Sequence, residues 1–551
     1  MADVKRRQVS IDEAISHVGG DFALAQKLQT AVCALAWSIT AFHTLLVIFT
    51  GLGIDPQRLR LIECTKTGGE ACEAALGHPY PAMCALPPDA WAFKSRGFSL
   101  VSEFNLVCDK AWLVHAAAGC FFLGTLIGCA IWHWLSDTVP PRRMLHSSAI
   151  ISGVAGSLAA TAPFLWAFML FRVLTGVGVG GIGLASFVLA SDVMGASWRP
   201  YTGLFLHGGF SAGAAAATLL AWVIPSWRWI TFLSGIASLA LAIFTWSLLV
   251  ESPQWLLLRG RKGEATAAIA SVAFTNSRRP PEFPLADPAG LLANPHRTLL
   301  DVLRNTRLRR STALLCLIWF IATTAYYSGV MLMDALGSGN PDGDGTSLEL
   351  ALSGFLYELP GVAAAWLVAE RLGRKHAAIG GLLQAGGCLL GAGLARGDAQ
   401  RALLVTARFG LAAACSAMYL LSWETFPVVV QHPGMAVTNY ASRIGAVVTP
   451  SLALAASRLR SGLVPLVLTG ATCLGAAILV SLLPETLNGP VHETIQDMNA
   501  AYSVKRHRSW TYSLKNVFKR PPSSSSGGAA GTPLGAVALP TMPLDPAARS
   551  V

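Results

Sequence analysis

Charged residues are scarce in this chain, and their scarcity excludes several classes of protein. Only 13% of the 551 residues are Asp, Glu, Lys or Arg, whereas 53% are hydrophobic. Soluble domains carry roughly 25% charged residues, so a soluble multi-domain chain is disfavoured. The sequence also lacks a P-loop and a His-Glu-x-x-His motif, which argues against nucleotide hydrolysis and zinc proteolysis. We therefore expect no enzyme activity, no cofactor and no metal site.

Two further absences narrow the interpretation. No Asn-x-Ser/Thr sequon occurs, so N-glycosylation is not expected. A cleavable signal peptide is also missing, because the first thirty residues mix basic and acidic side chains and the first apolar run has full spanning length. That run is predicted to stay in the protein as its first helix.

Apolar runs of spanning length are abundant. Helices satisfy every backbone polar group inside hydrocarbon, and the runs lack the short alternation of a membrane β-barrel. The chain is therefore predicted to be an all-α membrane protein with twelve spans. The predicted spans are 31–53, 111–135, 145–165, 167–191, 203–224, 228–250, 312–334, 347–369, 376–395, 401–423, 434–457 and 462–483.

Basic residues between the spans set the orientation. Lys and Arg exceed Asp and Glu by 41 to 30, and the excess clusters in short loops after alternate spans and in segment 251–311. This clustering follows the positive-inside rule and disfavours nucleic acid as a partner. Both termini and the central loop are predicted to be cytoplasmic, and the loop 54–110 extracellular or lumenal.

The predicted spans divide the chain into regions. The expected boundaries are a cytoplasmic segment 1–30, a six-helix half 31–250, a central loop 251–311, a second half 312–483 and a cytoplasmic tail 484–551. The tail carries basic residues before a Ser/Gly-rich run, so we expect it to be disordered at its end and to contact membrane lipids.

The two halves repeat the same landmarks. Glu251 and Glu485, after the sixth and twelfth spans, are 234 positions apart, and Arg172 and Arg408 in spans four and ten are 236 apart. The acids that lead the two basic loops are 233 apart. Near-equal offsets predict two pseudo-symmetric six-helix halves, the arrangement of the major facilitator fold, with a substrate site between them near the midplane.

Four of the eleven cysteines, Cys64, Cys72, Cys84 and Cys108, lie in or beside the loop 54–110. On an oxidising side of the membrane they are expected to form two disulfides, and three pairings are possible. The alternative is four unpaired thiols.

Charged residues at the cytoplasmic ends of the spans are candidates for a gate. Such charges can pair across the halves when the cavity closes inward and separate when it opens. Positive-inside anchoring is the alternative. The gating candidates are Asp137, Arg142, Arg143, Arg172, Asp192, Glu251, Glu370, Arg371, Arg374, Arg408, Glu424 and Glu485.

Ionisable residues inside apolar runs are costly, and they commonly mark a substrate path. Glu358 and Arg443 lie within predicted spans, so they are candidates to bind opposite ends of a zwitterion, or else to form a structural ion pair. Aromatic faces suit a quaternary ammonium. The remaining substrate-binding candidates are Tyr326, Tyr327, Tyr357, Phe187 and Ser191.

The motifs in their order resemble the organic cation/carnitine transporters of the major facilitator superfamily, especially the plant branch. The resembling stretches are 101–108 (VSEFNLVC), 171–176 (FRVLTG), 180–183 (GGIG), 226–229 (SWRW), 251–257 (ESPQWLL), 423–427 (WETFP), 483–486 (LPET) and 493–495 (ETI). The resemblance implies a plasma-membrane or vacuolar carrier of small organic cations or zwitterions such as carnitine, often proton-linked.

Three departures qualify this resemblance. Thr138 to Pro141 replaces the usual glycine before the first pair of bases, and Gln254 stands where the family has Arg. Arg443 stands where organic-cation carriers have Asp, whereas anion and carnitine carriers resemble this chain in having Arg. An organic-anion carrier, a sugar carrier of the same superfamily and a transport-dead receptor therefore remain alternatives.

Overall fold

The computed structural model describes residues 9–50, 62–76, 84–87, 89–93, 99–224, 226–280, 284–286, 299–337, 347–458, 463–489, 492 and 494–499. One compact unit, 1–498, contains all the long helices among them. Most of the tail that is predicted to be disordered lies outside the described residues.

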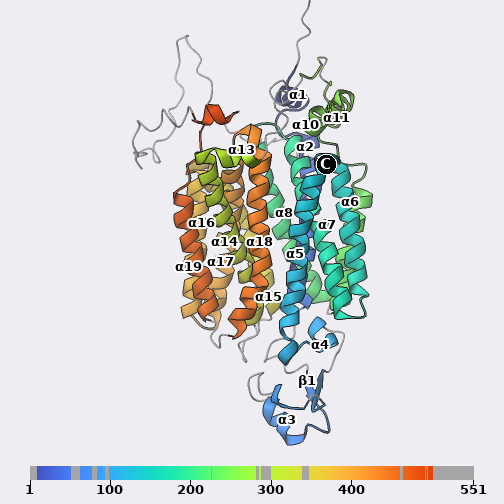
Figure 1. The fold of residues 1–551 in the computed structure, drawn as a ribbon, viewed down its shortest axis with the longest axis vertical. Coiled ribbons are helices and arrows are strands. Elements are labelled where there is room, and N and C mark those ends of the chain that lie inside the picture. The colour runs from blue at the N-terminus through green and yellow to red at the C-terminus, as the bar shows by residue number, and fades with distance from the viewer. Residues whose placement is uncertain are drawn as a thin grey trace, which may run out of the picture. The chain divides into compact units, whose positions relative to one another are not determined.

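Twelve helices in the described part of the chain have 18 or more residues, which confirms the predicted all-α fold (Figure 1). Ten of them are apolar enough to cross a membrane by length and composition. The other two, α6 and α18, are more polar. The twelve are α2 (Leu24–Thr50), α5 (Trp112–Leu135), α6 (Pro141–Ala160), α7 (Leu165–Asp192), α8 (Thr202–Val223), α9 (Trp227–Phe244), α14 (Thr306–Gly337), α15 (Ser347–Arg371), α16 (Arg374–Leu394), α17 (Asp398–Thr425), α18 (Gln431–Arg458) and α19 (Leu463–Ser481).

Helix ends differ from the hydropathy boundaries by several residues. Helix α14 begins at Thr306 and not at 312, because basic residues at its start stay hydrogen-bonded in the helix although they are too polar for hydrocarbon. Helix α9 ends at Phe244 and not at 250, since the backbone from Thr245 to Leu249 forms a turn instead. Hydropathy reports the membrane environment, whereas helix length follows backbone hydrogen bonding.

Short elements lie at the two ends of the bundle (Figure 1). One end carries α1 (Ile11–His17), α10 (Pro253–Leu258), α11 (Lys262–Thr275) and α13 (Leu299–Arg304), and the opposite end carries β1 (Ile62–Cys64), α3 (Gly69–Leu76), β2 (Trp91–Phe93), α4 (Leu100–Phe104) and η3 (Cys108–Lys110). Two further turns, η4 (Arg199–Tyr201) and η5 (Val428–Val430), link spans. The central basic loop and the cysteine-rich loop therefore face opposite sides, as the predicted topology requires.

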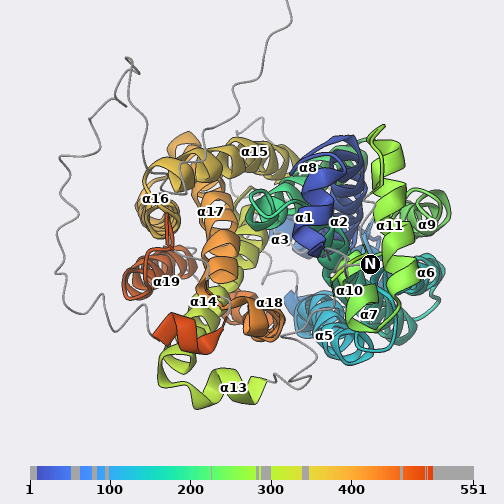
Figure 2. The ribbon, with the colours of Figure 1, turned by 90° about the horizontal axis from the view of Figure 1, so that it is seen from above.

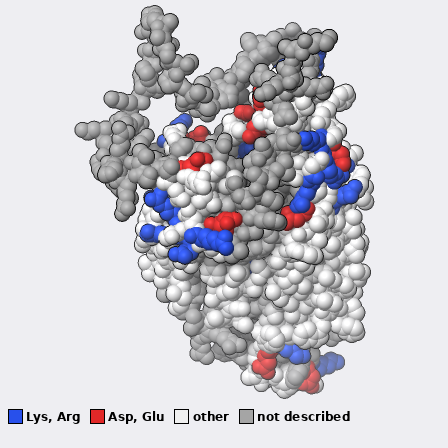
Figure 3. Space-filling model, turned by 45° about the horizontal axis from the view of Figure 1, so that its top comes forward, with Lys and Arg blue, Asp and Glu red and all other residues white. Residues whose placement is uncertain are grey.

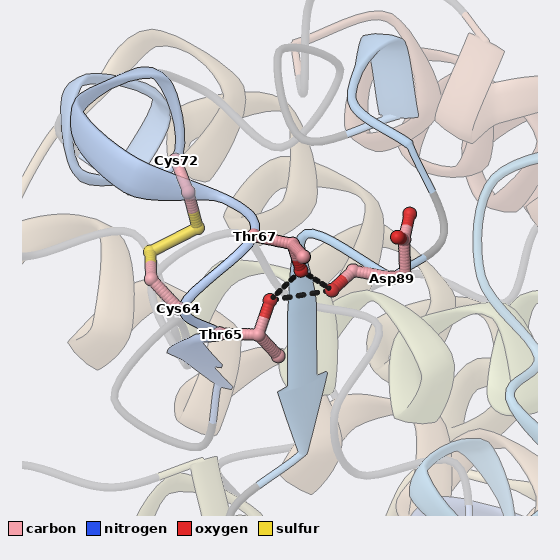
Figure 4. The surroundings of a disulfide bond; sticks show 5 residues. All are labelled: Cys64, Thr65, Thr67, Cys72 and Asp89. Atoms are coloured by element: carbon pink, nitrogen blue, oxygen red, sulfur yellow. Dashed lines mark hydrogen bonds between the residues drawn. A yellow bond between two sulfur atoms is a disulfide. The ribbon is translucent and has the colours of Figure 1, made fainter.

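The cysteine-rich loop is held by two disulfides. Of the three pairings that the sequence leaves open, the structure has Cys64–Cys72 and Cys84–Cys108. Strands β1 and β2 pair antiparallel beside the first bridge. The hydroxyls of Thr65 and Thr67 both donate to the backbone carbonyl of Asp89, at 2.8 Å for Thr67 (Figure 4). The two bridges and these hydrogen bonds fix the shape of a loop that also buries Trp91 and Leu100 in an apolar cluster.

The twelve helices form two halves that repeat the same contacts. The indole of Trp37 on α2 donates to Ser186 on α7 at 3.0 Å, and the indole of Trp319 on α14 donates to Ser422 on α17 at 2.9 Å. The halves meet mainly where α8 packs against α15 and where α5 packs against α18. In the view from above these two contacts lie on opposite sides of the central region (Figure 2).

Small residues allow close helix packing within the first half. A Cβ on Gly124 of α5 would overlap the carbonyl of Val173 on α7, and one on Gly176 would overlap the carbonyl of Phe121. The glycine run of α7 is therefore a packing surface and not a nucleotide loop. Figure 3 shows charges gathered at the ends of the molecule and the side between them mostly uncharged, as expected for a surface in lipid.

Candidate functional site

A central cavity lies between the two halves. It contains about 690 Å³ of empty space, including its open mouth. Six of the long helices line it, three from each half. The lining residues are Trp37, Thr40 and Thr44 of α2, Val179 and Gly183 of α7, His207 and Phe210 of α8, Trp319, Thr323, Tyr326 and Tyr327 of α14, Cys415 and Tyr419 of α17, and Ser442 and Arg443 of α18.

Arg443 is the one Lys, Arg, Asp or Glu among these lining residues. Its guanidinium crosses from the second half to the first, where it lies against the thiol of Cys129 on α5 and close to Gly183 on α7. The Nε atom is buried and has no hydrogen-bond partner. Within the described residues no carboxylate forms an ion pair with Arg443. The cavity therefore presents one positive charge that protein groups leave uncompensated.

Glu358 does not line the cavity, because it is fully buried in an ion pair with Arg408 of α17. The Ser211 hydroxyl donates to Glu358 at 2.6 Å, and the Tyr326 hydroxyl donates at 3.1 Å. The Arg408 guanidinium also stacks 4.1 Å from the ring centroid of Tyr326. A desolvated carboxylate with this many partners has its charge balanced within the protein. The expected alternative of a Glu358–Arg443 ion pair is thus wrong: the structural partner is Arg408.

The aromatic candidates divide into two groups. Tyr326 and Tyr327 line the cavity, whereas Tyr357 is half exposed on α15 and outside the lining set. Phe187 packs against Trp423 with ring centroids 5.5 Å apart, and Ser191 is buried beside Asp192. These three therefore lie away from the lining surface, although Gly183 on the same face of α7 reaches it.

Sequence reasoning missed several lining residues. Trp37, Trp319 and Tyr419 form one aromatic cluster, with ring centroids 6.0 Å apart for Trp37 and Tyr419 and 4.9 Å apart for Trp319 and Tyr419. An aromatic residue inside an apolar run is normally packing, so these residues gave no separate signal. The signal that could have found them is the repeat, because the two tryptophans occupy equivalent places in α2 and α14.

The two halves carry matching carboxylate contacts at the ends that are predicted to be cytoplasmic. Glu251 accepts from the backbone N–H of Arg142 at 3.0 Å, at the start of α6, and Glu485 accepts from the N–H of Arg374 at 2.9 Å, at the start of α16. Asp192 accepts from the Ser252 hydroxyl, as Glu424 does from the Thr486 hydroxyl. Burial raises the pKa of the Glu251 carboxyl, although the hydrogen bonds from Arg142 and Ser252 act against this.

The other gating candidates pair mostly within their own half. Asp137 forms an exposed ion pair with Arg259, and Arg374 pairs with Glu370 at 3.2 Å and with Glu424 at 3.1 Å. Arg143 and Arg371 are exposed. The Tyr201 hydroxyl crosses between the halves here, since it donates to Glu370 and accepts from the Arg374 guanidinium at 3.4 Å. Sequence reasoning did not single out Tyr201.

The described residues offer no catalytic or metal arrangement. They contain no cluster of three or more His, Cys, Asp or Glu side chains that could hold a metal ion. Residues 209–213 have Gly-x-Ser-x-Gly spacing, but they lie inside helix α8, where Ser211 donates to Glu358. A nucleophile elbow requires a strand-to-helix turn, so this spacing carries no hydrolase chemistry.

Comparisons with known proteins agree with this description. Residues 90–498 match the family model described as "Sugar (and other) transporter". A Drosophila melanogaster organic cation transporter protein is 31% identical over 72% of this chain and 74% of its own length. Organic cation/carnitine transporter 4 of Arabidopsis thaliana is 28% identical over 90% of this chain and 92% of its length. Human organic anion transporter 3 is 29% identical over 89% and 94%.

The solved structures that resemble this chain support the same fold. The proton:xylose symporter XylE, solved with 6-bromo-6-deoxy-D-glucose, superposes with a TM-score of 0.61 over 86% of this chain and 98% of its own, at 15% identity. The likeness at this identity concerns the fold alone. Together with the family match and the relatives, it shows that this chain belongs to the sugar (and other) transporter family of the major facilitator superfamily, as a multi-pass membrane transporter akin to the organic cation and anion carriers.

Proposed function

We propose that this chain is a secondary carrier of small organic ions that bear a carboxylate, both anions and zwitterions such as carnitine, and that it works by alternating access. The observation that carries the proposal is Arg443, a cavity-lining guanidinium without a carboxylate partner among the described residues. Guanidinium binds carboxylate through two parallel hydrogen bonds, and the contact is strongest where water is excluded.

The same observation weighs against the other candidates. A simple organic cation would meet an uncompensated positive charge in the cavity. A neutral sugar could pack against the six aromatic side chains of the lining, but it would leave the charge of Arg443 unpaired. A carboxylate removes both problems, since it neutralises Arg443 and satisfies the free Nε donor.

A zwitterion needs a second contact for its cationic end. Glu358 was a candidate from the sequence, but its oxygens already accept from Arg408, Ser211 and Tyr326. The aromatic cluster of Trp37, Trp319 and Tyr419 supplies an alternative, because a quaternary ammonium is held by ring faces and needs no hydrogen-bond acceptor.

Alternating access follows from the position of Arg443 between the halves. Its guanidinium contacts α5 and α7 of the first half. A bound carboxylate would therefore change a contact between the two halves, which move relative to each other during transport. The proposed cytoplasmic gate comprises the charge clusters around Asp137, Glu370 and Arg374, joined across the halves by Tyr201.

Uptake into proteoliposomes tests the proposal with three probes. Carnitine and benzoate carry a carboxylate, whereas choline does not. We expect saturable uptake of the first two and little of choline. Arg443→Gln should reduce carboxylate uptake by about 10- to 100-fold, the usual weight of a charge-assisted hydrogen-bond pair. Arg396→Gln, which removes an exposed arginine between α16 and α17, is the matched control.

Choline uptake equal to that of carnitine and unaffected by Arg443→Gln would contradict the proposal, and binding without flux would favour a receptor.

Proton coupling and the cellular membrane are part of the same proposal. An inward proton gradient should accelerate carboxylate uptake, and a fluorescent fusion should localise to the plasma membrane or the vacuolar membrane. We expect the basic tail to contact membrane lipids without changing the preference for carnitine and benzoate over choline.

A further inference from the structure

His207 is a cavity-lining residue with unused hydrogen-bonding capacity. It extends from α8 and is only 7% exposed. Its Nε2 atom is buried without a partner, and neither ring nitrogen makes a hydrogen bond within the part of the chain that the structure describes. A buried polar atom left unsatisfied costs about 1–3 kcal/mol, so a partner is expected in the working state.

A second buried histidine, His43, also leaves one ring nitrogen, Nδ1, without a hydrogen-bond partner among the described residues. His43 on α2 is fully buried, and its Nε2 atom lies 2.8 Å from the hydroxyl of Ser238. His43 is outside the lining set. The packed histidine thus has one hydrogen-bonded ring nitrogen, whereas the described residues give the histidine that reaches the cavity ring contacts, to Phe210, Tyr326 and Tyr419, and no hydrogen bond.

Helices α8 and α18, which carry His207 and Arg443, pack against different helices where the two halves meet. Helix α8 packs against α15, whereas α18, which carries Arg443, packs against α5, and these contacts lie on opposite sides of the central region (Figure 2). Tyr419 lies between them, with its ring centroid 6.3 Å from that of His207 and its hydroxyl within electrostatic reach of Arg443. Tyr419 thus borders both His207 and Arg443 in a lining that also includes the hydroxyls of Thr40, Thr44, Thr323 and Ser442.

We propose that His207 is the second polar contact of the substrate and hydrogen-bonds a hydroxyl or carbonyl group at the end remote from the carboxylate that Arg443 binds. This inference rests on the proposed function, which assigns the carboxylate to Arg443. A neutral imidazole offers one donor and one acceptor, so a hydroxyl can satisfy either nitrogen. The aromatic surface between the two contacts suits a planar spacer.

The proposal makes His207 a specificity-determining residue. A site built to bond a substrate hydroxyl discriminates against the analogue that lacks it, because the analogue leaves the buried protein group unpaired. The preferred substrates are therefore aromatic carboxylates with a hydroxyl opposite the carboxyl group. One neutral hydrogen bond corresponds to a preference of about tenfold.

Equilibrium binding to the full-length protein in nanodiscs tests the proposal. The probes are two matched pairs of different length, 4-hydroxybenzoate with benzoate and 4-hydroxycinnamate with cinnamate. Wild type should bind the hydroxylated member of at least one pair about tenfold more tightly. His207→Phe should bring that ratio close to one. His207→Gln, which keeps a donor and an acceptor, should retain part of the preference. His115→Phe, a histidine change outside the lining set, should retain all of it.

Three outcomes would overturn the assignment of His207. They are a wild-type ratio near one in both pairs, an unchanged ratio in His207→Phe, and an equal loss in His207→Gln and His207→Phe. The unsubstituted acids report separately on Arg443. If wild type binds neither benzoate nor cinnamate, or if Arg443→Gln binds them as well as wild type does, the carboxylate site itself is wrong and the proposed function fails first.

Discussion

The two halves of the molecule treat equivalent arginines differently. Arg172 of α7 and Arg408 of α17 each donate at 2.9 Å to a backbone carbonyl of the first helix of their half, at His43 and Tyr326 respectively. Arg408 also forms a buried ion pair with Glu358. Arg172 has no such partner in the described residues, and its guanidinium stacks 4.3 Å from the ring centroid of Phe121.

Close glycine contacts identify the equivalent positions at which the two halves differ. Gly124 on α5 faces the carbonyl of Val173, and Gly361 on α15 faces the carbonyl of Phe409. Three residues before each glycine stand Phe121 and Glu358. One half thus has an aromatic face where the other has a carboxylate. The fold repeats its scaffold, while the carboxylate partner and the cavity guanidinium both lie in the second half.

Removing Glu358 should have the largest effect on stability. Glu358→Gln leaves Arg408 buried without a counter-charge, which costs about 3–5 kcal/mol. Thermal unfolding in detergent should show a large loss, and Glu358→Gln with Arg408→Gln should recover part of it. If Glu358→Gln were as stable as wild type, Arg408 would not need Glu358 as its counter-charge.

Removing the buried arginine of the first half should cost less. Arg172→Gln removes a cation–π contact and one hydrogen bond but strands no carboxylate, so we expect a loss of about 1–2 kcal/mol. The same unfolding assay measures it. A loss equal to that of Glu358→Gln would end the distinction between the two halves.

The cross-half hydrogen bond at the cytoplasmic end should govern turnover. Tyr201→Phe removes the donor to Glu370 and should change the transport rate by about three- to tenfold with little change in apparent affinity, because it shifts the populations of the two states. Asp137→Asn breaks a pair inside one half and is the comparison variant. Equal effects of both variants on rate would favour a gate made of charges alone.

The carboxylates that cap α6 and α16, Glu251 and Glu485, should differ least in their effect on stability. Glu485 accepts from the N–H groups of Arg374, Lys375, Thr486 and Leu487, whereas Glu251 accepts from those of Arg142 and Ser252. Since burial raises the pKa of Glu251, its ionised form is disfavoured in the folded state, and stability that it costs at neutral pH returns as pH falls through that pKa.

Glu251→Gln should therefore cost less at pH 7 than Glu485→Gln, for which we expect about 1 kcal/mol, the usual weight of a helix cap. Unfolding at pH 7 and pH 5 measures both. A larger loss for Glu251→Gln would reverse the assigned order.

The sequence was most informative about the helices and least informative about which side chains pair with each other. Composition predicted twelve helices, and three near-equal offsets predicted the halves. It also marked Glu358 and Arg443 as costly residues, because a charge in an apolar run stands out locally. The partner of Glu358 could not be read in the same way, since Arg408 is 50 positions away and the choice depends on which helices are neighbours. His207 could not be singled out for the same reason, as no local pattern distinguishes a bonded histidine from an unbonded one.

Charge reversal at Arg443 tests the central claim most directly. The account assigns the choice of substrate to this one guanidinium in the cavity, with Glu358 neutralised elsewhere. Uptake of carnitine, choline and benzoate is to be compared in wild type, Arg443→Lys and Arg443→Asp at matched amounts of reconstituted protein. We expect Arg443→Lys to weaken carboxylate uptake and Arg443→Asp to abolish it while admitting choline. A folded Arg443→Asp protein with the wild-type substrate ranking would contradict the account.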